Sequence, residues 1–309
     1  MWRDQPDLVR TALSRLVRGE FRRGELDLPD GRVLRWVESG EQSPIVVLVA
    51  GAGETSLDWA PVLPAIAADT RVVAYDRAGL GASDPMATLT VEAEIADLVA
   101  LLTEIGPAVL VGHSWGGLLV QLVAFEHPDR VLGLVLVDPS HEEVLAALPP
   151  LGRVAARAMG GGVKLLRRVG LFGRVATAIG RGLAARCTED AEVRALITDA
   201  YVGSYRERHQ VAMIGDENRV VDGSSEFVRR LRRERKLPDI PVVALSAGGK
   251  GKPPELRERS IRLVGDVTAR TARGEQVVVA DAGHYIHHDK PAAVIDAVRQ
   301  VVEAVRADR

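Results

Sequence analysis

The sequence of 309 residues contains a single cysteine, Cys187. One thiol excludes an internal disulfide framework and a zinc site built from several cysteines. The chain also has no large excess of charge of one sign, because 42 acidic residues nearly balance 40 basic residues. Without a strongly basic surface, nucleic acid is not expected among the partners of this protein.

Long apolar runs are missing as well. No segment approaches the roughly 20 apolar residues that a membrane-spanning helix needs. The first seven residues are charged and lack the apolar centre of a signal peptide. We therefore expect a cytoplasmic protein with no membrane span. With 47% hydrophobic residues, the chain can bury one large core.

Short apolar runs alternate with helical patterns along much of the sequence. After an expected helix around residues 8–17, residues 25–37 alternate around a Pro-Asp-Gly turn, which predicts a hairpin. Six expected strands follow, at residues 45–50, 71–75, 108–111, 131–137, 241–245 and 276–280. Continuous apolar strands separated by helices predict an α/β fold with a doubly wound, mostly parallel sheet, in which ligands bind at the carboxyl ends of the strands.

The strand pattern stops between residues 139 and 237, where helical periodicity rich in Ala, Leu and Arg takes over. This stretch is too long for a loop. We predict a core of residues 1–138 and 238–309 with an inserted helical lid at 139–237. The lid arginines are expected to form solvated faces, with an anionic-substrate site as the weaker alternative.

The segment Gly112-His113-Ser114-Trp115-Gly116 lies between an expected strand and an expected helix. A Gly-x-Ser-x-Gly pattern in this context predicts a nucleophile elbow, in which the turn exposes the serine hydroxyl at the sheet edge. Glycines on both sides leave room for the strained turn. The alternative is an ordinary glycine-rich turn with an exposed serine.

A serine hydroxyl needs a neighbouring base to become a nucleophile. His284 is our candidate, because it follows the last expected strand and so lies at the same sheet edge as Ser114. The alternative is a packed loop histidine. We expect His287 and His288 to be exposed or to cap the following helix, and His113 to pack. The other histidines are expected to be structural, or in the lid for the last of them: His127, His141 and His209.

Four segments together resemble the α/β-hydrolase superfamily: residues 50–53, the Asp-Arg-x-Gly-x-Gly-x-Ser run at 76–83, the elbow at 112–116, and Ala282-Gly283-His284. The resemblance implies that the loop beginning at Asp76 is structural. It also implies a carboxylate that orients the base, usually placed after the penultimate strand. No carboxylate occurs there before Glu255.

The other position that this family uses for the acid lies after the strand that follows the elbow helix, where this chain has Asp138. Asp138 is our choice, although an aspartate before proline also forms turns. Glu142 and Glu143 are the next candidates. Glu255 follows two prolines and is better explained as the acid of a helix start. The order Ser114, Asp138, His284 is the order of nucleophile, acid and base in these hydrolases.

Acyl transfer also needs amides that stabilise an oxyanion. One predicted donor is the backbone amide of Trp115. By the resemblance, the second is the amide of Ala52, in the position of the family's His-Gly motif, with Gly53 left open. The Gly79-x-Gly81 pair lacks the dinucleotide-binding spacing, and no cluster has convincing metal spacing, so no cofactor and no metal is expected.

These predictions favour a serine hydrolase that cleaves a small-molecule carboxylic ester, or a related acyl bond, through a Ser-His-Asp triad and an acyl-enzyme. Perhydrolase, lactonase, amidase, thioesterase and carbon-carbon bond hydrolase activities remain open, because the same triad serves all of them. Within the family that the chain resembles, the serine at the elbow argues against epoxide hydrolases and haloalkane dehalogenases, which use an aspartate there. A binding protein or receptor with an unused pocket is the rival from another class. Oligomeric state and substrate identity stay open.

Overall fold

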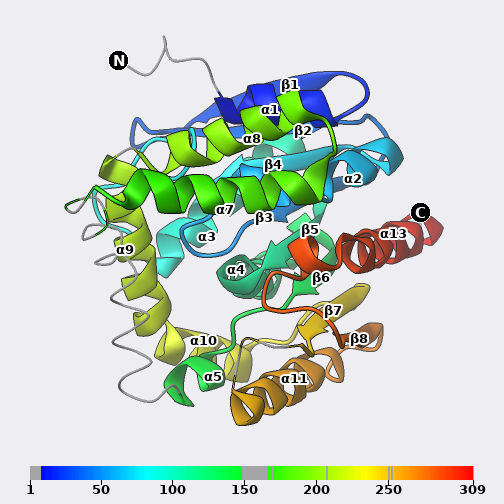
Figure 1. Cartoon of the computed structure of the whole chain (residues 1–309). Helices are drawn as coiled ribbons and strands as arrows, with labels where there is room; N and C mark the ends of the chain where they lie inside the picture. Colours follow the sequence, from blue (N-terminus) through cyan, green and yellow to red (C-terminus); the bar gives the residue numbers. More distant parts are fainter. Residues whose placement is uncertain are drawn as a thin grey trace.

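A computed structural model describes residues 8–147, 166, 168, 170–206, 208–249, 251 and 253–308. Its centre is one eight-stranded sheet with the order β1-β2-β4-β3-β5-β6-β7-β8 (Figure 1). The strands are β1 (Phe21–Asp27), β2 (Val33–Ser39), β3 (Ile45–Val49), β4 (Val72–Asp76), β5 (Ala108–His113), β6 (Val131–Val137), β7 (Val242–Ala247) and β8 (Gly274–Val279).

The first two strands form the predicted antiparallel hairpin, and β2 continues antiparallel to β4. Every later pair of neighbouring strands is parallel. The predicted α/β class and the doubly wound, mostly parallel sheet are therefore confirmed. Strands β4, β5 and β7 are buried along their whole length, which explains why they read as continuous apolar runs in the sequence.

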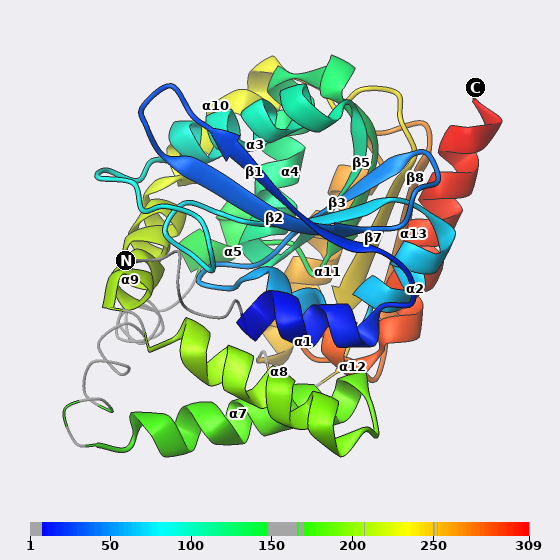
Figure 2. The ribbon, with the colours of Figure 1, turned by 90° about the horizontal axis from the view of Figure 1, so that it is seen from above.

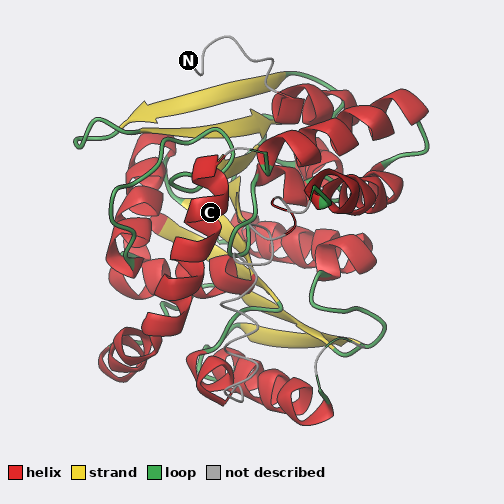
Figure 3. Cartoon of the chain, turned by 60° about the vertical axis from the view of Figure 1, so that its left-hand side comes forward, coloured by secondary structure: helices red, strands yellow, loops and turns green. Residues whose placement is uncertain are grey.

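Helices cover both faces of the sheet (Figure 3). Outside the segment between β6 and β7, the described helices are α1 (Leu8–Leu16), η1 (Ser56–Trp59), α2 (Leu63–Asp69), α3 (Val91–Ile105), α4 (Ser114–Glu126), η2 (Pro128–Arg130), α11 (Pro254–Thr268), α12 (Ile286–Asp289) and α13 (Pro291–Ala307). Figure 2 shows α2 and α13 on the opposite side of the strands from α3 and α4.

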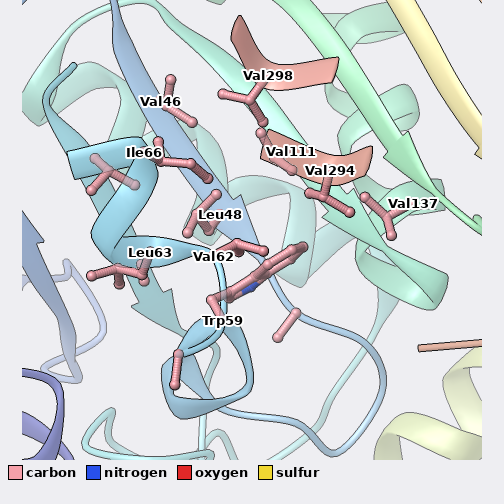
Figure 4. Close-up of a cluster of buried hydrophobic side chains, with 14 of the residues drawn as sticks. Val46, Leu48, Trp59, Val62, Leu63, Ile66, Val111, Val137, Val294 and Val298 are labelled. Atoms are coloured by element: carbon pink, nitrogen blue, oxygen red, sulfur yellow. The ribbon is translucent and has the colours of Figure 1, made fainter. Parts of the chain in front are cut away.

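Alternate residues of β3 enter two different cores, because successive side chains of a strand point to opposite faces. Val46 and Leu48 pack with Trp59 and with Val298 of α13 (Figure 4). Val47 on the other face belongs to the cluster formed with α3, α4 and α11. Both faces of the central strands are thus buried in hydrophobic cores. This packing holds the sheet, and with it the loops at the carboxyl ends of its strands, in place.

The chain between β6 and β7 forms helices, and its described residues contain no strand. We call this segment the insertion (139–237). Its described helices are α5 (Glu142–Ala147), α7 (Phe172–Cys187), α8 (Ala191–Ser204), α9 (Arg208–Gly223) and α10 (Ser225–Glu234). Helix α7 packs on α8, and α8 packs on α1 (Figure 1).

The domain limits at 138 and 238 stay a prediction, and part of the predicted lid, including Arg153, Arg157 and Arg167, lies outside the described residues. None of the helices in the described ranges combines the length and the apolar character that a membrane crossing requires.

Candidate active site

The elbow forms where β5 ends at His113 and α4 begins at Ser114. Ser114 has a φ of 50°, in the left-handed region that a residue with a Cβ rarely adopts. A Cβ on Gly112 would lie 2.4 Å from the Gly116 carbonyl oxygen, and a Cβ on Gly116 would lie 2.2 Å from the Val49 carbonyl oxygen. The two glycines are therefore required by close backbone packing, and the predicted strand-turn-helix geometry is present.

The side chains of Ser114, His284 and Asp138 form one chain of hydrogen bonds. His284 Nε2 lies 3.0 Å from Ser114 Oγ, and His284 Nδ1 lies 2.6 Å from Asp138 Oδ2. With Nδ1 donating to the carboxylate, Nε2 is left as an acceptor for the serine proton. The structure thus brings together the three side chains that the sequence predicts to form the site. His284 is 170 residues from Ser114 and 146 residues from Asp138 in the sequence.

Asp138 is held in place by the end of β7. It is 2% exposed and has a φ of 40°, so its backbone is strained like that of Ser114. Its amide donates to the Leu245 carbonyl at 2.7 Å, and its Oδ1 accepts from the Ala247 amide at 3.1 Å. These bonds fix both the backbone and the carboxylate, which leaves Oδ2 directed at the imidazole.

The other predicted acids are engaged elsewhere. Glu142 pairs with Arg232 at 3.0 Å, and Glu143 pairs with Arg229 at 2.8 Å. Glu255 is exposed in the first turn of α11, after two prolines, as a helix-start acid would be. Among these candidates, Asp138 alone has a described hydrogen bond to His284.

Ser140 is a neighbour of Ser114 that the sequence did not single out. Its Oγ lies 3.4 Å from Ser114 Oγ, and its amide donates to the Ser114 carbonyl at 2.8 Å. The available signal was its place two residues after Asp138, at the same strand end.

The loop after β3, residues 50–53, lies beside the elbow, because Gly116 packs against the Val49 and Ala50 carbonyls. The Gly53 amide donates to Glu217 Oε2 at 2.5 Å, so it is already used. The Ala52 amide has no hydrogen-bond partner among the described residues. The Trp115 amide lies in the first turn of α4, whose amides lack partners within their own helix. The amide of Gly53, the alternative donor, is therefore already bonded, and the Ala52 amide stays the predicted donor.

His113, which was expected to pack, also bonds to the backbone of His284, the predicted base. Its side chain is buried, with Nδ1 3.0 Å from Glu54 Oε2 and Nε2 3.1 Å from the His284 carbonyl oxygen. Burial opposes a charge on the ring, but the Glu54 and Asp58 carboxylates raise the pKa of His113 above its ordinary value. The loop that carries His284 is thus tied to the end of β5.

The expectation that His287 and His288 are exposed or capping is wrong for His287, whose side chain is fully buried against Trp59. Its Nε2 lies 2.9 Å from Asp58 Oδ2, and His288 Nε2 lies 3.1 Å from Asp58 Oδ1. Burial lowers the pKa of His287 well below its ordinary value. A histidine at a helix start is usually exposed, but His287 is drawn into the interior by its bond to Asp58, which lies 229 residues away in the sequence.

Two overlapping sets of side chains have ligand atoms close enough for a metal: Asp58 with His287 and His288, and Asp58 with Glu54 and His113, each within 4.8 Å. In this structure the same atoms hydrogen-bond one another, so the two sets form one polar network behind His284. The network supports the loop of the predicted base.

The loop beginning at Asp76 has the structural geometry that the resemblance implies. The Asp76 carboxylate accepts from the Ser56 amide at 2.7 Å and from the Ala82 amide at 2.9 Å. A Cβ on Gly81 would lie 2.2 Å from the Asp76 carboxylate. His141, expected to be structural, is also buried, and burial lowers its pKa to about 4, so it is neutral near pH 7.

Comparison with known proteins identifies the shared fold. The model of the alpha/beta hydrolase family matches residues 46–297. Epoxide hydrolase A of Mycobacterium tuberculosis is 38% identical over 116 residues, which cover 35% of this chain and 36% of that protein. The chain spans about a third of the length of the epoxide hydrolases that it matches, 33% of mouse epoxide hydrolase 4 and 36% of the mycobacterial enzyme.

Three further proteins are similar over most of the chain. The mouse sn-1-specific diacylglycerol lipase ABHD11 is 25% identical over 264 residues, which cover 82% of this chain and 80% of that protein. The structure of wild-type Cfl2 from Burkholderia cenocepacia has a TM-score of 0.74 at 26% identity, covering 93% of this chain and 97% of that one. A thermophilic esterase from Thermogutta terrifontis has a TM-score of 0.63 at 23% identity, covering 92% and 99%. At that identity, the likeness to the esterase shows the fold alone.

Proposed function

Because the chain belongs to the alpha/beta hydrolase family, we propose that it is a serine hydrolase that cleaves carboxylic esters through an acyl-enzyme. The observation that carries the proposal is the unbroken hydrogen-bond chain from Ser114 through His284 to the buried Asp138. A nucleophile, a base within reach of its proton and an acid that orients the base are the requirements of this chemistry.

In the proposed reaction, Ser114 Oγ attacks the ester carbonyl while its proton moves to His284 Nε2. Asp138 accepts the Nδ1 hydrogen bond and stabilises the imidazolium that forms. The amides of Ala52 and Trp115 donate to the oxyanion of the tetrahedral intermediate. Collapse of the intermediate breaks the carbon-oxygen bond to the alcohol, which takes the proton from His284. Water, deprotonated by His284, then releases the acid and restores Ser114.

Ester cleavage fits the serine better than epoxide opening, although several relatives are named epoxide hydrolases. An aspartate that opens an epoxide forms an ester, which water can cleave. Ser114 opening an epoxide would form an ether, which this base and water cannot hydrolyse. Thioester, lactone and peracid chemistry use the same acyl-enzyme and remain alternatives to the carboxylic ester.

We also propose that the insertion acts as a lid over the serine. Support comes from α9, whose Ile214 packs against Gly53 in the loop of the Ala52 amide. A helical cover at this edge would exclude water from the acyl-enzyme and shape the acyl site. The predicted small-molecule substrate and cytoplasmic location are part of the same proposal.

The proposal is tested by turnover of a panel of p-nitrophenyl esters of increasing acyl length, with a lactone, an acyl thioester, a peracid assay and styrene oxide as further arms. We expect ester hydrolysis that is lost in Ser114→Ala and kept in Ser14→Ala, a matched change at an exposed serine on α1. Hydrolysis of the oxide alone would contradict ester chemistry. A folded protein that turns over none of these compounds would favour the rival, a ligand-binding protein on the same fold.

A further inference from the structure

We propose that Glu217, on helix α9 of the insertion, is a positioning residue that fixes the backbone around the Ala52 amide. The insertion would then complete the oxyanion hole in addition to covering it. This inference rests on the proposed function, because it assigns Glu217 a part in stabilising the oxyanion of the same reaction.

Glu217 connects the insertion to two loops of the core. Its side chain is fully buried, with 0% exposure. Its Oε2 accepts from the Gly53 amide at 2.5 Å, and its two oxygens accept from Arg77 Nε at 2.7 Å and Arg77 Nη2 at 3.0 Å. A buried carboxylate with this many charge-assisted bonds holds its partners firmly.

Arg77 extends the connection to the residues before Ala52. Its side chain is also buried, and it donates to the Ala50 carbonyl at 2.5 Å and the Gly51 carbonyl at 2.6 Å. The Gly51 amide in turn donates to Glu54 at 2.6 Å. The peptides that precede Ala52 are therefore fixed by side chains of the core.

The residue after Ala52 is fixed from the insertion. Besides the bond from Gly53 to Glu217, the Tyr205 hydroxyl donates to the Gly53 carbonyl at 3.2 Å. Both polar groups of Gly53 are thus bound to the insertion. Since the Ala52 amide has no partner among the described residues, the bonds around it hold it ready to donate.

Helix α9 packs closely enough on the loops of Gly53 and Gly79 for Glu217 to have this role. A Cβ on Gly53 would lie 3.0 Å from Ile214 Cγ1, and a Cβ on Gly79 would lie 2.3 Å from Met213 Cγ. Both glycines have positive φ values, 75° and 72°. Contacts this close show that α9 packs directly on the backbone of the two loops, so Glu217 reaches Gly53 without a bridging group.

The buried charges match this arrangement. Glu217 offsets the charge of Arg77, while Glu94 lies 3.3 Å from Arg77 Nε and accepts from the Trp115 indole at 3.0 Å. Burial, and then the nearby Glu217 carboxylate, raises the pKa of Glu94 well above its ordinary value. Arg77 therefore lies between two buried carboxylates, and Glu217 is the one that the insertion supplies.

The test compares Glu217→Gln with Asp216→Asn, a neighbour on α9 whose charge pairs with Arg219 near the surface. The introduced glutamine keeps the size of the side chain but has one acceptor oxygen in place of two. With that oxygen at Gly53, its NH2 group would face Arg77 Nε, and two donors cannot bond each other, so the bonds that hold Arg77 and Gly53 cannot all be kept. We expect kcat on the best ester to fall by about ten- to a hundredfold with little change in KM, because the oxyanion exists only after attack. Affinity for an alkyl boronic acid, which forms an anionic tetrahedral adduct, should fall by a similar factor. Asp216→Asn should change neither value.

Hydrogen exchange of the peptide that contains residues 50–53 gives a readout that does not need turnover. We expect faster exchange there in Glu217→Gln and unchanged exchange in Asp216→Asn. If Glu217→Gln does not fold, Tyr205→Phe carries the same test, since it removes only the hydroxyl that binds Gly53. If folded Glu217→Gln has the same kcat, boronate affinity and exchange rate as the wild type, the inference is overturned, while the proposed function is left intact. A wild type that cleaves no ester would contradict the proposed function, and the exchange measurement would still decide whether Glu217 holds the loop.

Discussion

Replacing Asp138 by asparagine removes one charge and changes few atoms, so it tests the assigned acid with little change in packing. In the wild type, Asp138 Oδ1 accepts from the Ala247 amide and Oδ2 accepts from His284 Nδ1. An asparagine that keeps the bond from Ala247 must turn its NH2 group toward His284. The imidazole then accepts at Nδ1 and carries its proton on Nε2, where it can no longer accept the proton of Ser114.

The expected loss follows from this change of tautomer. In a Ser-His-Asp triad, the wrong tautomer lowers kcat on the order of 10⁴-fold, which corresponds to about 5.5 kcal/mol in the activation free energy. KM should change little, because Asp138 is 2% exposed and its carboxylate faces His284. Steady-state hydrolysis of a p-nitrophenyl ester measures both values, and thermal unfolding shows whether the variant is folded.

Glu255→Gln is the matched control, because Glu255 is the first carboxylate after β7 and is exposed on α11. It should leave kcat within about twofold of the wild type, as surface substitutions usually do. A large loss in Glu255→Gln, or a folded Asp138→Asn with less than about a tenfold loss against the order of 10⁴ expected, would refute the assignment of the acid.

Two further predictions concern the scaffold. Gly116→Ala should lower the free energy of unfolding by about 1–3 kcal/mol or more, because its Cβ would lie 2.2 Å from the Val49 carbonyl oxygen. Urea unfolding measures this loss. A variant as stable as the wild type would contradict the close packing at the elbow. Glu94 has a folded pKa above its ordinary 4.5, so its neutral form contributes stability that is present below that value and is lost as pH rises through the folded pKa. Glu94→Gln should therefore lose less stability than the wild type as pH rises above 4.5, the ordinary pKa of a glutamate. Equal losses in the two proteins would contradict the raised pKa of Glu94.

The sheet could be predicted from local patterns because its central strands are buried on both faces. Runs such as Val131–Val137 remain apolar throughout, and the Pro-Asp-Gly turn after β1 marks the hairpin. The elbow was predictable for a similar reason, since close backbone packing permits only glycine at Gly112 and Gly116. These features depend on neighbours in sequence or on a simple periodicity.

Features that depend on distant partners could not be read from the sequence. His287 lies in the short helix α12, yet it is buried, with its Nε2 bound to Asp58, 229 residues away. Glu217 lies 164 residues from Gly53, and nothing in the helical pattern of α9 distinguishes it from a solvated acid. The choice among the carboxylates was likewise open until the register of β6 and β7 placed Asp138 beside His284.

The central claim is that Ser114 is an activated nucleophile, and covalent labelling tests it most directly. The folded protein is treated with a fluorophosphonate, and the modified residue is mapped by mass spectrometry. We predict a single adduct on Ser114 that is absent from Ser114→Ala. An unmodified wild type, or an adduct on Ser140 in place of Ser114, would contradict the account.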